Sequence, residues 1–137
     1  MKHSKLLFIT FAFLINGVTA QGTDFIPYSK ENFEALQKQD RRIVLQYHAS
    51  WCPICKRQRN VLEALTKDPN LKNVEFVTAN YDSDKEVRKQ YAVKWQSTLI
   101  LFQGGKELKR SQGMTDATEL ADFLKMALGS KSDSKLN

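Results

Sequence analysis

The sequence predicts a single α/β domain in which strands alternate with helices before a closing hairpin. Three apolar runs rich in β-branched residues are typical of strands: Arg42–His48, Val74–Tyr81 and Thr98–Phe102. Stretches with helical spacing separate these runs. The length of 137 residues, with 42% hydrophobic and 26% charged residues, suits one globular domain and excludes a disordered or multi-span membrane protein. The expected element order is β-α-β-α-β-α-β-β-α.

The first half of the domain begins with a short strand and a capped helix. Phe25–Tyr28 is predicted to be a strand, and Ser29 is a plausible N-cap for a helix over Lys30–Gln39. Phe33 and Leu36 form the apolar face of that helix.

A second helix is predicted over Cys52–Thr66, directly after the strand Arg42–His48. The turn sequence at Asp68–Asn70 ends it. Its apolar and basic residues fall on different sides, so the basic cluster is expected to be a solvated face. The apolar side holds Val61, Leu62 and Leu65, and the basic side holds Lys56, Arg57 and Arg59.

The second half continues with a short polar helix over Ser83–Tyr91 and the strand Thr98–Phe102. Gly104–Gly105 then indicates a tight hairpin to a final strand. An amphipathic helix is predicted over Thr115–Leu128, with Gly129 as its C-cap.

The chain divides into a leader at residues 1–20, a domain at 21–129 and a polar, disordered tail at 130–137. The leader has a basic start (Met1–Lys5), a ten-residue apolar run (Leu6–Ile15) and small residues at Val18–Ala20, the pattern of a secretory signal peptide. An uncleaved anchor is the alternative, although ten apolar residues span only about half of a bilayer core. A secreted protein is expected, with the periplasm as its compartment.

The net charge and the number of cysteines limit the functions that the sequence can have. The net charge of +6 is spread without a dense basic stretch, so no nucleic-acid partner is expected. The chain has two cysteines, Cys52 and Cys55, too few and too close for a disulfide-stapled scaffold.

The segment Trp51-Cys52-Pro53-Ile54-Cys55 lies where a buried strand passes into a helix. The helix N-terminus stabilises a thiolate at Cys52, and Pro53 suits the first helical position because it has no N–H to lose. The two-residue spacer keeps Cys55 within one turn of Cys52. The pattern predicts an exposed, readily ionised attacking thiol and a more buried resolving thiol, which together carry out thiol–disulfide exchange.

Zinc binding and a structural disulfide account for the cysteine pair less well. A zinc site needs two more Cys or His ligands, and His48 is the only histidine outside the leader, so a closed site within one chain is excluded. An inert structural disulfide would close too short a loop to restrain much chain entropy.

From about Phe25 to Leu128 the chain resembles the thioredoxin family. The resemblance rests on the segments ASWCPICK, NYD at 80–82, TLILF, FQGGKE and Gly113. The stretch LTKDPNLKNVEFVTANYDSDKEV is also similar to the C-terminal periplasmic domain of DsbD-type proteins. The family implies a thioredoxin fold with a central mixed five-stranded sheet flanked by helices, Cys52 as nucleophile and Cys55 as resolving thiol. It also implies extended protein substrates bound around Trp51 and the loop before TLILF.

Three departures from the family pattern concern the surroundings of the cysteines. Ser97 stands where the family has a cis-proline, so a trans Gln96–Ser97 bond is predicted. Either the Ser97 hydroxyl contacts the Cys52 sulfur, or serine at this position is a tolerated loop substitution. Gln46 replaces a buried acid and Thr78 its lysine partner, so Gln46 has no proton to transfer.

The third departure is His48, which replaces a tryptophan. His48 and Asp82 are expected either to form a pH-responsive pair or to leave the histidine in a structural role. Trp95 replaces a small residue and either extends an apolar contact surface or packs on the preceding helix.

The predicted function is thiol–disulfide exchange with protein substrates through Cys52 and Cys55, in the reductive direction, by a monomer that needs no cofactor. A membrane thiol–disulfide partner supplies or accepts the electrons. The alternative is a binding module, because Ser97 in place of the cis-proline opens access for a metal or an iron–sulfur cluster shared by two chains.

Overall fold

A computed structural model describes residues 24–129, so the predicted signal peptide and polar tail lie outside the described residues. The strands are β1 (Ile26–Pro27), β2 (Arg42–His48), β3 (Val74–Asn80), β4 (Thr98–Gln103) and β5 (Lys106–Gln112). The helices are α1 (Lys30–Lys38), α2 (Pro53–Leu65), α3 (Lys85–Gln90) and α4 (Ala117–Lys125). Two short 3₁₀ turns, Pro69–Leu71 and Met126–Leu128, follow α2 and α4.

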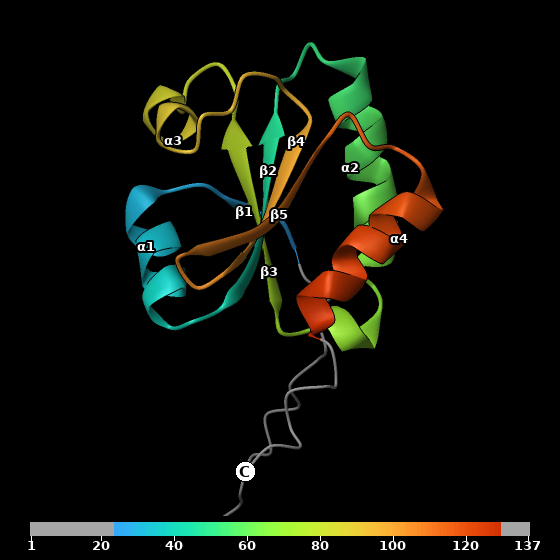
Figure 1. Cartoon of the computed structure of the whole chain (residues 1–137). Coiled ribbons are helices and arrows are strands. Elements are labelled where there is room, and N and C mark those ends of the chain that lie inside the picture. Colours follow the sequence, from blue (N-terminus) through green and yellow to red (C-terminus); the bar gives the residue numbers. More distant parts are fainter. Residues whose placement is uncertain (1–23, 130–137) are drawn as a thin grey trace, which may run out of the picture.

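The five strands form one mixed sheet in the order β1-β3-β2-β4-β5. The pairs β1–β3 and β2–β3 are parallel, whereas β2–β4 and β4–β5 are antiparallel. Helices α1 and α3 cover one face of the sheet, and α2 and α4 cover the other (Figure 1). The predicted fold class and element order are confirmed, and β2 has the predicted bounds.

Side chains of the central strand β2 point alternately into two cores, as the period of a strand requires. Ile43 and Leu45 pack on the α1/α3 side with Phe33. Val44 packs on the other side with Leu62 of α2 and with α4. Because both faces are covered, the strand is apolar along nearly its whole length.

Local capping chemistry explains where several elements begin and end. The Ser29 hydroxyl accepts a hydrogen bond from the amide of Asn32 at 3.3 Å, which confirms the predicted N-cap of α1. The last helix begins at Ala117, two residues later than predicted, because the Asp116 carboxylate caps it through the amides of Thr118 and Glu119. Gly129 has a φ of +74°, as expected of a C-cap.

The hairpin turn requires its glycine at position 104. Gly104 has a φ of +53°, and a Cβ there would lie 2.7 Å from an Asp40 side-chain oxygen. The predicted hairpin is confirmed, with Gln103 paired to Lys106 across the turn.

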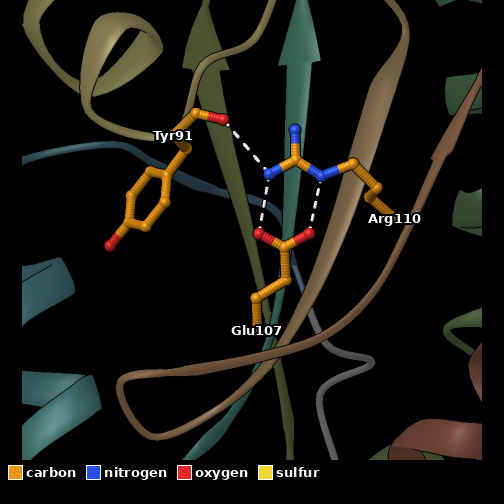
Figure 2. Close-up of polar contacts among 3 residues, drawn as sticks. All are labelled: Tyr91, Glu107 and Arg110. Carbon is orange, nitrogen blue, oxygen red and sulfur yellow. Dashed lines mark hydrogen bonds and ion pairs between the residues drawn. The ribbon is translucent and has the colours of Figure 1, made fainter.

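The loop at residues 91–97, between α3 and β4, is attached at its beginning to strand β5. Arg110 donates two hydrogen bonds to the carboxylate of Glu107, at 2.6 and 2.7 Å, and a third to the carbonyl of Tyr91 at 3.1 Å (Figure 2). The hydrogen bond from Arg110 lowers the pKa of Glu107. This bidentate pair fixes the start of the loop that leads to Ser97.

Candidate active site

The connection between β2 and α2 and the loop before β4 lie at the same end of the sheet (Figure 1). At this end Cys52 and Cys55 form a disulfide, with their Cα atoms 5.3 Å apart. Ala49 is buried against the pair, and the ring of Tyr81 packs on it.

Cys52 is the N-cap of α2, the position that the sequence predicts. Its Sγ accepts a hydrogen bond from the backbone amide of Cys55 at 3.1 Å, and Pro53 takes the first helical position. The unpaired amides and positive end of a helix favour negative charge at this position. When the disulfide is reduced, the same environment stabilises a thiolate on Cys52.

The expectation of an exposed Cys52 is wrong for the oxidised protein. Cys52 is 3% exposed and Cys55 is fully buried. Only the predicted order of exposure is confirmed, with Cys52 more exposed than Cys55. Burial arises because Ala49 and Tyr81 pack against both cysteines. Only a small part of Cys52 remains open to an incoming group.

Exposed apolar side chains lie next to the pair in the chain. Trp51 is 57% exposed and Ile54 is 47% exposed, while Pro53 between them is also exposed. The Trp51 indole N–H donates to the Asp82 carboxylate at 2.9 Å, which fixes the direction of the ring. Large exposed hydrophobic residues gathered in this way are typical of a contact surface for other proteins.

Trp95 extends this apolar character to the loop before β4. It is 59% exposed, which favours the alternative that it extends an apolar contact surface. Its carbonyl accepts from the Thr98 hydroxyl at 2.7 Å, and the neighbouring Lys94 carbonyl accepts from the Tyr81 hydroxyl at 2.7 Å. Because Tyr81 also packs on the cysteines, the loop and the disulfide share a structural support.

Ser97 adopts a backbone conformation that proline cannot adopt. No cis peptide bond occurs in the described residues, so the predicted trans Gln96–Ser97 bond is confirmed. The φ of Ser97 is +55°, and its amide donates to the Tyr47 carbonyl at 2.9 Å. The hydroxyl donates to the Gln96 carbonyl at 2.6 Å, so the predicted contact with the Cys52 sulfur is wrong.

We therefore expect Ser97→Pro to destabilise the protein by about 2 kcal/mol and not to restore a family-like loop. Proline requires a φ near −65° and removes the amide that donates to Tyr47. Chemical denaturation of the two proteins measures the change. Ser97→Gly is the matched control, since glycine tolerates the positive φ and keeps the amide. Equal stability of the proline variant and the parent would contradict the conformation described here.

Beneath the loop, Gln46 on β2 and Gln58 on α2 form a fully buried pair. The Gln46 side-chain amide donates to the Gln58 carbonyl oxygen at 3.0 Å. The Gln58 amide donates in turn to the carbonyls of Ser97, at 3.2 Å, and Met114, at 2.9 Å. The Oε1 atom of Gln46 is buried without a partner. This pair connects the central strand to the Ser97 loop and supplies no titratable proton.

Gln58 is not among the predicted site residues, although its position in the helix indicates that it is buried. It lies four residues before Leu62 and seven before Leu65, on the apolar side of the helix. A polar side chain on an apolar face must find buried partners, and Gln58 finds three.

Of the two alternatives for His48, the pair with Asp82 is wrong, whereas a structural role remains consistent with its partial burial. Asp82 accepts from Trp51, and the charged neighbour that acts on His48 is Arg59. Burial, and then the Arg59 cation, lower the pKa of His48 below its ordinary value of 6.5.

The prediction that Arg59 is part of a solvated face is also wrong. The guanidinium lies over the Phe25 ring, with Cζ 3.7 Å from the ring centroid, and donates to the Thr78 hydroxyl. Lys56 and Arg57 are exposed as predicted. Phe25 lies 34 positions before Arg59 in the sequence, so the periodicity of the helix does not predict the contact between Arg59 and Phe25.

Residues 24–129 contain no group of three or more His, Cys, Asp or Glu side chains placed to hold a metal ion. A cluster shared by two chains would use both cysteines as free thiolates, whereas here they are bonded to each other. The two-chain cluster stays a prediction. No helix in the same range is long and apolar enough to cross a membrane.

Comparisons with known proteins agree with this architecture. Residues 24–126 match the thioredoxin family. A thioredoxin from Chlamydia trachomatis serovar D is 38% identical over 96 residues, which cover 70% of this chain and 91% of that protein. A probable protein disulfide-isomerase A6 from Medicago sativa is 29% identical over 88% of this chain, which spans only 34% of its length.

A solved structure gives the same result at the level of coordinates. The crystal structure of Trxlp from Edwardsiella tarda EIB202 superimposes with a TM-score of 0.72 at 37% identity, covering 74% of this chain and 98% of that one. A family match over most of the described residues, together with these relatives, establishes the relationship. The chain belongs to the thioredoxin family.

Proposed function

We propose that this chain is a reductase of protein disulfides that works outside the cytoplasm. Family membership and the Cys52–Cys55 pair make it a thiol–disulfide oxidoreductase. The observation that carries the proposal is the hydrogen bond from the Cys55 amide to the Cys52 sulfur at a helix N-terminus. This geometry favours the ionised form of the attacking thiol.

The reaction proceeds in two exchange steps. The Cys52 thiolate attacks one sulfur of a substrate disulfide, forms a mixed disulfide and releases the other substrate sulfur as a thiolate. Cys55 loses its proton and attacks the Cys52 sulfur, which releases the second substrate thiol and forms the Cys52–Cys55 disulfide. Two electrons pass to the substrate, and its two sulfurs take up two protons. Gln46 cannot accept the Cys55 proton, so water or the departing substrate thiolate takes it.

The exposed residues Trp51, Ile54 and Trp95 provide an apolar surface for an extended segment of the substrate protein. The Ser97 loop beside it is fixed by its own hydrogen bonds, so the surface is formed before a substrate arrives.

The proposal also covers the direction of electron flow, the cellular compartment and the electron donor. The reductive direction is supported by the similarity of residues 65–87 to the periplasmic domain of DsbD-type proteins. The leader pattern at residues 1–20 supports secretion to the periplasm, where a membrane thiol–disulfide protein must re-reduce the pair. A monomer suffices, because both reacting sulfurs lie on one chain.

The reduction potential of the Cys52–Cys55 pair tests the direction. Equilibration of the purified protein in glutathione buffers of graded composition, followed by quenching and separation of the two forms, measures it. A reductase is expected to have a potential below about −220 mV, near that of thioredoxin. A value near −120 mV, that of a strong oxidant, would contradict the reductive direction.

A further inference from the structure

A cavity of about 440 Å³ lies at the carboxyl ends of β1, β2 and β3, and disulfide exchange does not require it. We name it the Arg59 cavity. Its walls include Phe25, Tyr28, His48, Arg59, Asn80 and Asp84. The volume is comparable to that of small-molecule sites in proteins.

Arg59 brings to this cavity a positive charge that has no ion-pair partner among residues 24–129. Its guanidinium is fixed against the Phe25 ring and bonded to the neutral Thr78 hydroxyl. The ion pairs of the described residues involve other cations, and none includes Arg59. Burial lowers the pKa of Arg59, and the Glu63 carboxylate on the same helix offsets this effect only in part. A carboxylate in the cavity would give the guanidinium a direct ion-pair partner.

Neutral donors surround the cation. The side-chain oxygen of Asn80 accepts from the amides of Asp82 and Ser83, at 2.9 and 3.1 Å, which leaves its NH₂ group unused. The Tyr28 hydroxyl and the His48 ring likewise have no hydrogen-bond partner among residues 24–129. Free donors around a fixed cation are what an oxyanion needs.

Asp84 limits the charge that the cavity accepts. Its carboxylate accepts from the Asn80 backbone amide at 2.7 Å and from the Ser83 hydroxyl at 3.5 Å, and these bonds fix the group on the cavity wall. Asp84 repels every negative charge on a ligand, so a second charge would add repulsion that the single cation Arg59 does not offset. A monoanionic, planar carboxylate therefore suits the lining better than a phosphate.

We propose that the Arg59 cavity binds a monoanionic carboxylate, with Arg59 as its charge partner. The cavity adjoins the redox site through the chain, because Asn80 precedes Tyr81 and Asp82, which contact the cysteines and Trp51. The carboxylate belongs either to a free small acid or to the C-terminus of a substrate peptide. Binding itself does not depend on disulfide exchange.

Titration of the oxidised, ¹⁵N-labelled protein with N-acetylglycine tests binding, and the uncharged N-acetylglycinamide serves as the matched ligand. Chloride holds the ionic strength constant, and the pH stays above the titration of His48. With N-acetylglycine, we expect saturable chemical-shift changes at the Arg59 side chain and the Asn80 side-chain amide, at millimolar affinity. We expect none with N-acetylglycinamide. Equal shifts with both compounds, or no saturation, would overturn the proposal.

Variants distinguish binding in the Arg59 cavity from nonspecific attraction to surface charge. Arg59→Gln should weaken binding at least about tenfold, whereas Arg57→Gln, on the same helix but exposed, should leave it unchanged. Equal weakening in both variants would also overturn the proposal. If Arg59→Gln fails to fold, His48→Trp takes its place, because the larger ring fills the cavity and should abolish binding.

A second measurement identifies the source of the carboxylate. The reduction of a disulfide peptide with a free C-terminus is compared with that of its C-terminal amide. A KM at least about threefold lower for the free acid, lost in Arg59→Gln, identifies the substrate terminus as the ligand. Equal KM values alongside saturable binding of N-acetylglycine identify a free acid. If binding occurs while neither peptide is reduced, the proposed function fails and the carboxylate site stands.

Discussion

Cys55→Ser is expected to convert the protein into one that captures its substrates and does not release them. The variant keeps the backbone amide at position 55, so Cys52 retains its hydrogen-bond donor and still attacks a disulfide. Without the second sulfur, the mixed disulfide persists. Turnover should fall on the order of a thousandfold or more, because the two sulfurs act as one unit.

Mass spectrometry of the reduced variant mixed with a disulfide peptide checks this result. One peptide should remain attached to Cys52, and an added thiol should release it. Cys52→Ser is the control and should form little adduct, because Cys55 is fully buried. Cys55→Ala repeats the test without placing a hydroxyl in the core. Preferential attachment to Cys55 in Cys52→Ser would reverse the assigned roles.

Gln58→Leu should cost about 3 kcal/mol of stability, because it removes two buried hydrogen bonds and one part-buried hydrogen bond at once. The Met114 carbonyl and the Gln46 amide lose the partner that Gln58 provides. The Ser97 carbonyl keeps only its bond from the Gly113 amide, at 3.0 Å. A loosened Ser97 loop should raise KM for protein disulfides more than it lowers kcat.

A double-mutant cycle with Gln46→Leu tests this coupling. Gln46→Leu alone leaves the Gln58 oxygen without its donor, whereas the double variant removes both members of the Gln46–Gln58 bond. The double variant should lose less stability than the sum of the single variants by about 1 kcal/mol. Additive losses, measured by denaturant unfolding, would show that the two glutamines act independently.

Periodicity predicts the fold well because both faces of the sheet are covered. The strand at Arg42–His48 is apolar along its length, and this property is visible in the sequence before any contact is known. Helix boundaries depend on single capping bonds instead. The N-terminus of α4 differs from the prediction by two residues because Asp116, and not the preceding residues, caps it.

The part of the site that follows from local sequence is also predicted well. The place of Cys52 at the helix N-terminus, Pro53 at the helix start and the trans bond at Ser97 all depend on neighbours in the chain. The solvated Arg59 and the His48–Asp82 pair are wrong predictions because the surroundings of these side chains come from elements other than their own. Which ring or carboxylate a side chain meets depends on how the elements pack, and the spacing of residues in one helix does not record this.

The ionisation of Cys52 in the reduced protein is the central claim, and alkylation rates test it most directly. The reduced protein is treated with iodoacetamide across a series of pH values, and the rate at each cysteine is followed by mass spectrometry. We expect Cys52 to react rapidly at about pH 7 with little further gain at higher pH, while Cys55 reacts far more slowly. A Cys52 rate that keeps rising towards about pH 8.5, as for an ordinary thiol, would contradict the account.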